Sequence, residues 1–565
     1  MSAAVESFDL VVLGAGAGGL TAATVAARQG LATLLIEKSS FVGGTTAISG
    51  GMVWVPDNHL MQAAGIQDSR EAARSYLTAT VPEAAARTKL ESYLEAAPEA
   101  IRYLCDNTEV KLQPVFRYPD YYPDLPGATL GGRVLEPVPF DGVRLGEAFA
   151  WLRPPMPEIT ILGGMMVARE DIPHFRRFAT SPASAVRVMH LVLRHLRERM
   201  SHSRGTSLVL GNALAGRLLL SARTAGVQIR RNTSVEALVV ENDQCLGVHA
   251  VSNADTSVIH ARCGVVLATG GFSHDKELRC KLMPQVAHEI SATIGFAAAD
   301  GIRLAAGAGA ALADDMADPA FWVPISRYTS TAGRQVVYPH TVADRAKPGC
   351  IAVDQSGRRF VNEAVSYHEF VRAMLRSPNG SAMRAHLICD SRFIWRYGLG
   401  ASKPFTIRFA PYIAAGYLKR AASLGEMARQ IGVPEAALQK TVRRFNEGAT
   451  RGDDPEFGRG RDDYQRHLGD PDQKPNPCVA AIAAPPFYAV ELRPGDLGTA
   501  AGIRTDEHGR VLSTQGRPIP GLYAAGNDAA SIMHGNYPGP GITLGPALTY
   551  GYLAARAAAT PGQLR

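Results

Sequence analysis

The first forty residues contain a short apolar segment, a glycine-rich turn, an alanine-rich segment and a second apolar segment that ends in an acid. The apolar segments at 8–13 and 32–36 predict two strands, and residues 18–30 predict the helix between them. The turn at 14–19 reads Gly-Ala-Gly-Ala-Gly-Gly. Strand, glycine turn, helix, strand and acid together are typical of a dinucleotide-binding βαβ unit. The chain is therefore expected to begin with a Rossmann-like domain.

Three of the four glycines of this turn have an expected task. Gly14 permits the tight turn, Gly16 lets the backbone approach the pyrophosphate, and Gly19 lets helix and strand pack closely. The helix N-terminus supplies N–H groups and a positive dipole end for the phosphates. Glu37 follows the second strand, where a carboxylate would hold the adenosine ribose hydroxyls.

Small residues and hydroxyls fill the segment 43–51, and they would let the backbone lie along the cofactor. Residues 227–240 and 264–267 predict further strands, and the second ends in a turn at 268–271 where the chain can recross the adenine side. The residues of the N-terminal half that we expect to contact the cofactor, beyond those named above, are Gly18, Lys38, Gly44, Thr45, Ser49, Gly50, Gly51, Val235, Ala268, Thr269 and Gly270.

Residues 307–309, at the end of a segment that Asp300 and Gly301 open, imitate part of a second dinucleotide fingerprint. No apolar strand precedes them, and their glycines lie at the end of a predicted alanine-rich helix, where glycine commonly terminates helices. We therefore expect no nicotinamide site, and the electrons would leave by another carrier.

The C-terminal region carries two glycine-rich runs, at 521–527 and 536–545. Residues 542–558 predict an apolar helix that starts close to Gly541, because Pro546 is tolerated only in a first turn. Its N-terminus would point at the flavin pyrimidine ring and stabilise negative charge there, so both ends of the chain are expected to fold onto one FAD. The expected cofactor contacts in this region are Gly526, Asn527, Thr543 and Leu544.

The run Tyr537-Pro538-Gly539-Pro540-Gly541 contains more than a cofactor site needs. A phenol and a free backbone N–H at the mouth of a flavin pocket can together polarise a substrate carbonyl. Tyr537 and Gly541 are therefore candidate catalytic residues.

Composition is that of a globular enzyme. The chain has 565 residues, 46% of them hydrophobic and 20% charged, which is enough for two or more domains. The net charge of +7 is spread along the chain, and we expect no nucleic-acid partner. Seven scattered cysteines without a Cys-x-x-Cys pair predict neither a metal site nor a disulfide framework. Without a recognisable leader or an apolar run of 18 residues, the expected location is the cytoplasm or the cytoplasmic face of a membrane.

The expected fold class is α/β with an inserted α+β domain. Residues 1–319 form the first part of the FAD-binding domain, 320–485 the substrate domain, and 486–565 the return segment. The inserted part is richer in aromatic residues and short strands such as 349–353, and it includes a predicted helix at 424–431.

Residues 150–210 allow two interpretations. An apolar run at 159–167 precedes a segment at 183–200 in which apolar residues alternate with four arginines. Such a pattern suits an amphipathic helix on an anionic membrane surface. It equally suits a helix that packs on the domain and exposes a solvated basic face. The arginines are Arg187, Arg194, Arg197 and Arg199.

The two ends of the chain resemble the succinate dehydrogenase/fumarate reductase flavoprotein superfamily, and the run at 537–541 narrows the resemblance to the 3-ketosteroid Δ1-dehydrogenases. The segment 117–122, Arg-Tyr-Pro-Asp-Tyr-Tyr, resembles a Pro-Asp-Tyr-Tyr segment of that family. The segment 359–367 resembles the one that ends in its proposed catalytic base. The motifs occur in the family's order over nearly the whole chain, and the longer region 150–210 is the departure.

The resemblance implies a role for each of four residues. Tyr367 would take the C2 proton of a steroid A ring, with Tyr121 beside it to tune or relay that proton. The Tyr537 hydroxyl and the Gly541 N–H would bind the C3 carbonyl oxygen. The C1 hydrogen would leave as hydride to N5 of a non-covalently bound FAD, and an external acceptor, a quinone or a redox protein, would take the electrons.

General physical chemistry supports this reaction independently of the family resemblance. A ketone makes its α-proton acidic if donors hold the enolate oxygen. A phenol, with a reference pKa near 10, serves as base only in a low-dielectric site with a partner that favours phenolate. The alternatives are a Δ4-dehydrogenase of 5α-3-ketosteroids, and a fumarate- or urocanate-type reductase, whose arginine donor we do not find. A non-catalytic electron-transfer flavoprotein is a further alternative, and it would not need Tyr537.

Overall fold

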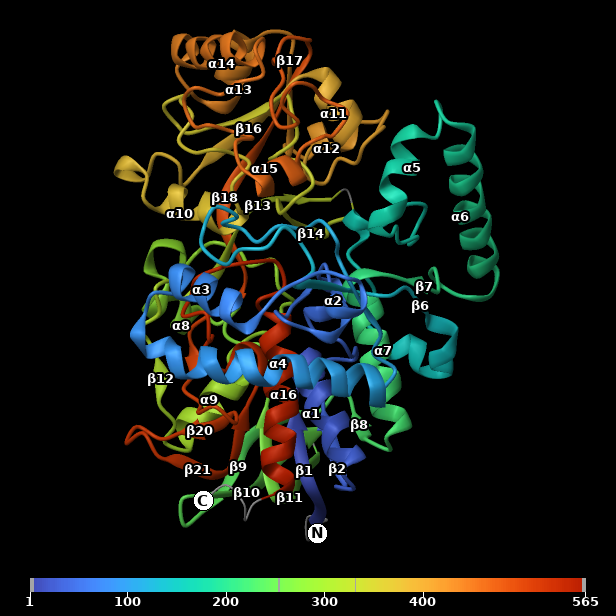
Figure 1. The fold of residues 1–565 in the computed structure, drawn as a ribbon, viewed down its shortest axis with the longest axis vertical. Helices are drawn as coiled ribbons and strands as arrows, with labels where there is room; N and C mark the ends of the chain where they lie inside the picture. The colour runs from blue at the N-terminus through green and yellow to red at the C-terminus, as the bar shows by residue number, and fades with distance from the viewer. Residues whose placement is uncertain (1–4, 253–254, 331, 561–565) are drawn as a thin grey trace.

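The computed structural model describes residues 5–252, 255–330 and 332–560. It has a lower part, where both chain ends lie, and an upper part formed by the middle of the chain (Figure 1). The lower part is built on an eight-stranded sheet with the order β20-β21-β11-β1-β2-β8, to which β10 and β9 are added beside β11. Its strands are β1 (Val5–Leu13), β2 (Thr33–Ile36), β8 (Gln228–Arg230), β9 (Ser234–Glu241), β10 (Gln244–Ser252), β11 (Asp255–Leu267), β20 (Arg510–Leu512) and β21 (Pro518–Ala524).

The central strands of this sheet are parallel: β1 pairs with β2 and β11, and β11 pairs with β21. Since β21 comes from the C-terminal region, both ends of the chain meet in one sheet. The predicted α/β fold class is confirmed. The helices of the lower part are α1 (Ala17–Arg28), α2 (His59–Ala63), α3 (Arg70–Thr80), α4 (Arg87–Asn107), α7 (Leu210–Thr224), α8 (Lys276–Leu282), α9 (Asp300–Gly307) and α16 (Leu544–Ala559).

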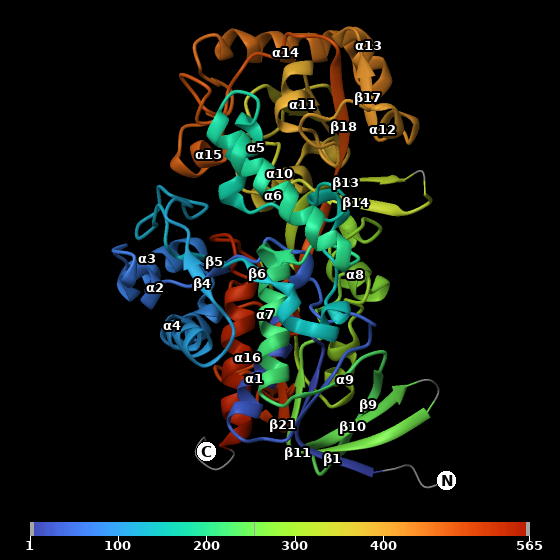
Figure 2. The ribbon, with the colours of Figure 1, turned by 90° about the vertical axis from the view of Figure 1, so that its right-hand side faces the viewer.

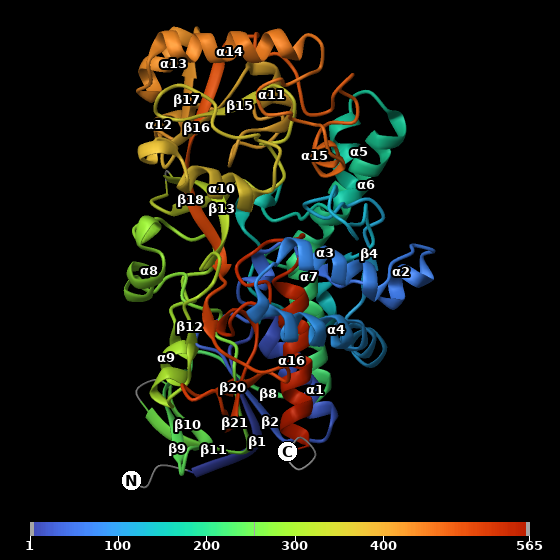
Figure 3. The ribbon, with the colours of Figure 1, turned by 60° about the vertical axis from the view of Figure 1, so that its left-hand side comes forward.

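Helix α1 lies between α16 and α7, and α4 packs on α16 (Figure 3). Helices α1 and α16 approach closely because their contact is made by small residues: a Cβ on Gly551 would collide with the Gly18 carbonyl. Pro546 lies in the first turn of α16, as its missing N–H requires. The predicted helices at 18–30 and 542–558 are confirmed within two residues.

Two predicted strands have different bounds in the structure. The expected strand 227–240 is divided into β8 and β9, because Asn232 between them has a φ of 54° and turns the chain. The expected strand 264–267 is only the end of β11, which begins at Asp255 and also pairs with β10. The first half of β11 contains polar residues, so the apolar pattern did not predict a strand there.

The upper part contains a six-stranded sheet with the order β14-β13-β18-β16-β15, and β17 pairs with β18. Its strands are β13 (Ala320–Thr329), β14 (Gln335–Pro339), β15 (Cys350–Val353), β16 (Ala385–Cys389), β17 (Leu418–Ala421) and β18 (Phe487–Thr499). Its helices are α10 (Tyr367–Leu375), α11 (Ser391–Tyr397), α12 (Ala410–Ala414), α13 (Leu424–Ile431), α14 (Glu435–Ala449) and α15 (Asp463–Leu468).

Strand β18 belongs to the upper sheet, where it pairs with β13, β16 and β17. We therefore place the return of the chain to the lower part after Thr499, later than the expected boundary at Pro486. The proline suggested a break, but the apolar strand after it completes the upper core.

Smaller elements connect the two parts. They are β3 (Val53–Trp54), β4 (Leu112–Pro114) and β5 (Val134–Pro137) in one sheet, β6 (Phe140–Asp141) with β7 (Ser207–Leu208), and β12 (Leu312–Ala313) with β19 (Gly502–Ile503). Helices α5 (Ile172–Arg177) and α6 (Pro182–Ser201) lie on the side of the molecule that faces the viewer in Figure 2, and α6 runs down toward the junction of the two parts. None of the helices in the described residues is long and apolar enough to cross a membrane.

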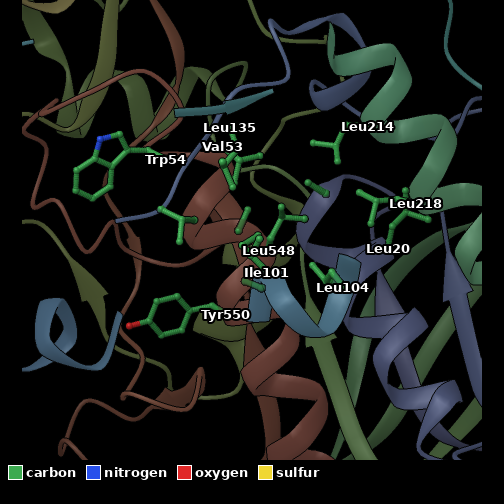
Figure 4. Packing of buried hydrophobic residues seen from close by; sticks show 14 of the residues in the cluster. Leu20, Val53, Trp54, Ile101, Leu104, Leu135, Leu214, Leu218, Leu548 and Tyr550 are labelled. Carbon is green, nitrogen blue, oxygen red and sulfur yellow. The ribbon is translucent and has the colours of Figure 1, made fainter. Parts of the chain in front are cut away.

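The largest buried apolar cluster joins the lower part to the junction. Leu20 of α1, Leu218 of α7 and Leu548 of α16 belong to it, as do Val53 and Trp54 of β3 (Figure 4). The same cluster continues to three tyrosines at the junction, Tyr121, Tyr367 and Tyr537. The junction is thus part of the main core.

Candidate active site

The glycine turn after β1 leaves no room for side chains. Gly14 has a φ of +97°, and a Cβ on it would collide with the Ala268 carbonyl. A Cβ on Gly19 would collide with the carbonyl of Gly14, so helix and turn touch. Gly16 differs, because no atom lies within 4 Å of its ideal Cβ position at the N-terminus of α1. This open space beside a helix N-terminus is a cradle that a phosphate can enter.

The segment 43–51 lies against this cradle. A Cβ on Gly44 would be 3.3 Å from the Gly16 Cα, and the Ser49 hydroxyl accepts the Gly51 N–H at 3.0 Å. The ideal Cβ position of Gly50 has no atom within 4 Å. Gly44 therefore lies beside the glycine turn and Gly50 borders open space, whereas Gly51 packs against the backbone of Gly211.

Both carboxylate oxygens of Glu37 accept backbone N–H groups, one from Ala15 at 2.9 Å and one from Ser39 at 2.8 Å. Glu37 thus braces the glycine turn, and its ribose contact stays a prediction. Lys38 forms an ion pair with Asp300 at 2.8 Å. Val235 is half-buried at the start of β9.

Asp528 holds the turn after β11, and the sequence analysis missed it. Its buried carboxylate accepts the N–H groups of Thr269 at 2.5 Å and Gly271 at 2.8 Å, as well as the Thr269 hydroxyl. Burial raises the pKa of this carboxyl, and the backbone donors oppose that shift. Its place directly after Asn527 is the signal that could have identified it. Thr45, from the segment 43–51, accepts the N–H of Ile294 at 3.4 Å.

A small cavity lies at the N-terminal end of α16. Gly526, Asn527 and Thr543 line it together with Phe321 and Ile542, and Leu544 begins the helix. The structure therefore brings the two C-terminal runs of expected cofactor residues to one place.

Three tyrosines from distant segments meet at the junction of the two parts. The Tyr121 hydroxyl donates to that of Tyr367 at 2.9 Å, and the Tyr367 hydroxyl donates to that of Tyr537 at 2.8 Å. Tyr367 is the first residue of α10, and Ser366 caps that helix. All three side chains are buried. The predicted catalytic tyrosines thus form one continuous hydrogen-bonded chain.

Burial raises the pKa of each phenol in this chain. The pKa of Tyr537 rises to about 12, and those of Tyr121 and Tyr367 rise well above their ordinary value. For Tyr367 the nearby Tyr537 adds to the effect of burial, whereas the hydrogen bond donated by Tyr121 lowers the pKa. Tyr121 is therefore placed to favour the phenolate form of Tyr367.

Gly541 has a φ of +98°, and a Cβ on it would lie 2.7 Å from the backbone of Met52 and from the Trp54 nitrogen. Its carbonyl accepts the Trp54 N–H at 3.2 Å. Within the described residues its own N–H has no hydrogen-bond acceptor. Only glycine fits this position, and it leaves a backbone donor available.

Other aromatic residues surround the three tyrosines. The ring of Tyr464 lies 4.7 Å from that of Tyr121, and the rings of Phe321 and His368 lie 5.5 and 5.6 Å from that of Tyr537. Sequence reasoning missed all three. His368 directly follows Tyr367, which is a usable signal, but Tyr464 comes from α15 and has no local one. No group of His, Cys, Asp or Glu side chains in the described part of the chain could hold a metal ion.

A protein-family model described as FAD binding domain matches residues 9–544. The chain is 38% identical to a 3-oxosteroid 1-dehydrogenase of Mycobacterium tuberculosis over 98% of each chain. It superposes with a TM-score of 0.91 and 38% identity on a 3-ketosteroid Δ1-dehydrogenase from Sterolibacterium denitrificans, over 98% of this chain and 100% of that one. The chain belongs to the 3-ketosteroid Δ1-dehydrogenase family.

Another relative of this chain is named for a different ketone. A relative from Sinomonas cyclohexanicum named 4-oxocyclohex-2-ene-1-carboxylate 5-dehydrogenase is 37% identical over 97% of this chain and 93% of its own. The superposition with the Sterolibacterium enzyme leaves only 2% of this chain uncovered. The expectation that the region 150–210 departs from the wider family stays a prediction.

FAD is the cofactor of this family member. The residues present leave room for FAD. Gly14 and Gly19 keep the turn tight, and Gly16 and Gly50 border open space. Residues of the C-terminal region line most of the cavity at the start of α16. Among the described residues, no other segment fills the Cβ position of Gly16.

Proposed function

We propose that this protein is an FAD-dependent 3-ketosteroid Δ1-dehydrogenase, which removes hydrogen from C1 and C2 of the steroid A ring. One observation supports this most strongly. The hydroxyls of Tyr121, Tyr367 and Tyr537 form a chain with spacings of 2.9 and 2.8 Å, and the free N–H of Gly541 lies four residues beyond Tyr537.

The first task is to make the C2 proton acidic. The Tyr537 hydroxyl and the Gly541 N–H hold the C3 carbonyl oxygen and stabilise the negative charge that develops there when C2 loses its proton. Neither donor has to reorganise, because Tyr537 is buried and Gly541 is fixed against Met52 and Trp54. When bound, FAD supplies the two-electron acceptor for the hydride that leaves C1.

The second task is to remove that proton. Tyr367 acts as the base, and Tyr121 donates a hydrogen bond that stabilises its phenolate. The three phenols are buried and carry no permanent charge, which suits an apolar steroid. Phe321, whose ring lies 5.5 Å from that of Tyr537, adds an apolar wall.

A small keto acid is the strongest competing substrate, because the Sinomonas relative is named for one. A carboxylate would need an uncommitted cation near the tyrosines. Arg133 is paired with two carboxylates, and Arg345 donates to four backbone carbonyls. Because Arg133 and Arg345 already bind these protein groups, neither is available to a substrate carboxylate, which favours the uncharged steroid as substrate.

We infer that an external acceptor, a quinone or a redox protein, reoxidises the flavin. The fingerprint-like glycines Gly307 and Gly309 lie at the end of α9 rather than before a helix, so they do not form a nicotinamide site of the usual kind. The family members are named as dehydrogenases, in agreement with an acceptor other than the substrate.

We also infer contact with a membrane through α6. Ser184, Leu191 and His195 turn toward the body of the protein and are buried. The opposite face carries an apolar stripe with side chains between 49% and 85% exposed: Val186, Met189, Leu193, Leu196 and Met200. Leu162, from the run at 159–167, is also 58% exposed, although Met165 and Met166 of that run are buried.

The charges on α6 suit an anionic surface. Helical geometry places Arg197 and Arg194 along one border of the apolar stripe and Arg199 along the other. Arg194 and Arg187 have acidic partners on the protein, Glu198 and Asp171, and both arginines remain about half exposed. An apolar face bordered by arginines is typical of helices that lie in a membrane interface.

The decisive experiment for the catalytic proposal is anaerobic addition of androst-4-ene-3,17-dione to the purified holoenzyme. The flavin absorbance should bleach, and turnover with a dye acceptor should give the 1,4-diene, identified by mass and NMR spectra. 4-Oxocyclohexanecarboxylate, tested in parallel, should bleach the flavin far more slowly. Bleaching by the keto acid alone, or a 4,5-unsaturated product from a 5α-steroid alone, would overturn the proposal.

A further inference from the structure

A buried ion cluster lies behind the tyrosines. Arg133 is fully buried and forms two hydrogen bonds with the Asp68 carboxylate, at 2.9 and 2.7 Å. Its remaining terminal nitrogen donates to Asp120 at 2.9 Å. Asp120, the residue before Tyr121, is also fully buried. Two carboxylates thus share one guanidinium, and the desolvation of such buried charges can cost more free energy than their attraction returns.

The Asp120 carboxylate contacts three separate segments. Besides Arg133, it accepts the indole N–H of Trp54 at 2.8 Å and the backbone N–H of Thr129 at 3.0 Å. A Cβ on Gly539 would lie 2.8 Å from the Trp54 indole nitrogen and 3.3 Å from Asp120. The loop that carries Tyr537 therefore packs directly on this carboxylate and its indole partner.

Backbone contacts join the two tyrosine loops at the same place. The N–H of Tyr121 donates to the Pro538 carbonyl at 3.0 Å, and the Tyr76 hydroxyl donates to that carbonyl at 2.5 Å. The Arg133 guanidinium lies 5.7 Å from the ring centres of both Trp54 and Tyr76. The Arg133 guanidinium therefore packs against Trp54 and Tyr76, and Tyr76 in turn binds the Pro538 carbonyl.

We propose that Asp120 is a positioning residue for the desaturation, which clamps the Tyr121 loop to the Tyr537 loop through Trp54, Arg133 and the surface against which Gly539 packs. This inference rests on the proposed function. Proton transfer and carbonyl binding depend on the relative placement of the hydroxyls, and an error near 1 Å in such a geometry costs about 10²-fold in rate. The side-chain hydrogen bonds of Asp120 go to Trp54, Thr129 and Arg133, and none goes to a catalytic hydroxyl.

The substitution Asp120→Asn tests the clamp without creating an unpaired charge. Arg133 keeps its two hydrogen bonds to Asp68, so the buried guanidinium stays neutralised. The asparagine oxygen can still accept from Trp54, but the amide cannot accept from Arg133 and Trp54 together as the carboxylate does. The variant is therefore expected to fold and to retain FAD while the Tyr121 loop loses one anchor.

Stopped-flow reduction of the holoenzyme by androst-4-ene-3,17-dione gives the required readout. We expect Asp120→Asn to lower the limiting rate of flavin reduction by 10- to 100-fold, with the apparent steroid affinity changed by less than about threefold. Gly539→Ala, which pushes on the same contact from the other loop, should produce the same pattern. The double variant should be little slower than the slower single variant, because both changes disturb one contact.

Asp454→Asn is a matched control. Asp454 is also buried and shares one guanidinium, that of Arg359, with a second carboxylate, Glu363, which keeps its hydrogen bonds in the variant. It should lower thermal stability without changing the rate of flavin reduction. If Asp120→Asn reduces flavin as fast as wild type, slows it only as much as the control does, or loses its FAD, the positioning role is refuted. Failure of the wild-type enzyme to be reduced would instead overturn the proposed function.

Discussion

The hydroxyl oxygens of Tyr367 and Tyr537 lie 2.8 Å apart, although 170 residues separate them in the chain. One comes from the start of a helix in the upper part, and the other from a loop that returns to the lower part. The proposed base and the proposed carbonyl-binding phenol are thus neighbours. This spacing is what the removal of a proton from the carbon next to a carbonyl requires.

Replacing Tyr367 by phenylalanine should nearly abolish flavin reduction while leaving FAD bound. Loss of a general base typically costs 10²- to 10⁴-fold in rate. Rapid-reaction kinetics and the flavin spectrum measure the two properties separately. Tyr523→Phe, a change at a buried tyrosine of β21, is the control. A Tyr367→Phe enzyme with more than about a third of the wild-type rate would remove Tyr367 from the mechanism.

The Tyr537→Phe enzyme should be slower by ~10²-fold or more, the usual cost of one donor to a developing oxyanion. Because the loss affects the transition state, it should appear mainly in kcat rather than in KM. Steady-state kinetics with a dye acceptor distinguish the two parameters. Unchanged kcat with a raised KM would mean that Tyr537 only helps to bind the steroid.

The rate of flavin reduction should rise with pH between pH 7 and pH 10. The base acts as phenolate, and the pKa of Tyr367 lies well above its ordinary value, so the active fraction grows as pH increases toward that pKa. In Tyr121→Phe the donated hydrogen bond is lost, the pKa of Tyr367 rises further, and the same rate is reached only at higher pH. Stopped-flow rates of flavin reduction, measured over this pH range in both enzymes, test the direction of the pH dependence. A profile that is flat in wild type, or that moves to lower pH in the variant, contradicts it.

FAD should be bound without a covalent link. In succinate dehydrogenase a histidine attaches the flavin, but the corresponding segment Thr45-Thr46-Ala47 of this chain has no histidine. Acid precipitation of the yellow protein should therefore leave the flavin in the supernatant, where its absorbance is measured. Flavin that stays in the washed pellet would falsify this expectation.

Helix α6 should bind anionic vesicles. Basic residues near such a surface contribute about 1 kcal/mol each, and the apolar stripe adds insertion, so binding should weaken with salt and with loss of either component. Flotation with phosphatidylserine vesicles at low salt should recover the wild type but not Leu193→Glu or a variant that lacks residues 183–200. Arg197→Gln should bind more weakly and keep its activity on dissolved steroid. A wild type that stays at the bottom of the gradient would identify α6 as an ordinary packed helix.

Local patterns in the sequence were sufficient to predict the FAD-binding unit. The glycine spacing at 14–19 restricts the backbone to one tight turn, and the structure has Gly14 at a φ of +97° against the Ala268 carbonyl. Helices α13 and α16 were also predictable, since their apolar periodicity and their proline positions act within one turn. The strand that begins at Phe487 pairs with β13 and β16 of the upper sheet, and no local pattern predicts such a pairing because it is a long-range property.

The sequence by itself determined which residues of this protein are suited to a flavin and to a ketone, because glycine turns, helix starts and the Tyr-Pro-Gly-Pro-Gly run express their chemistry locally. Only the tertiary structure decided that Tyr121, Tyr367 and Tyr537 share one hydrogen-bonded chain, and that Asp120 lies against Gly539. Those distances result from packing between segments hundreds of residues apart, and buried side chains such as Arg133 and Trp54 maintain them. No local pattern encodes such a contact, because each partner satisfies its own local rules whether or not the other is near.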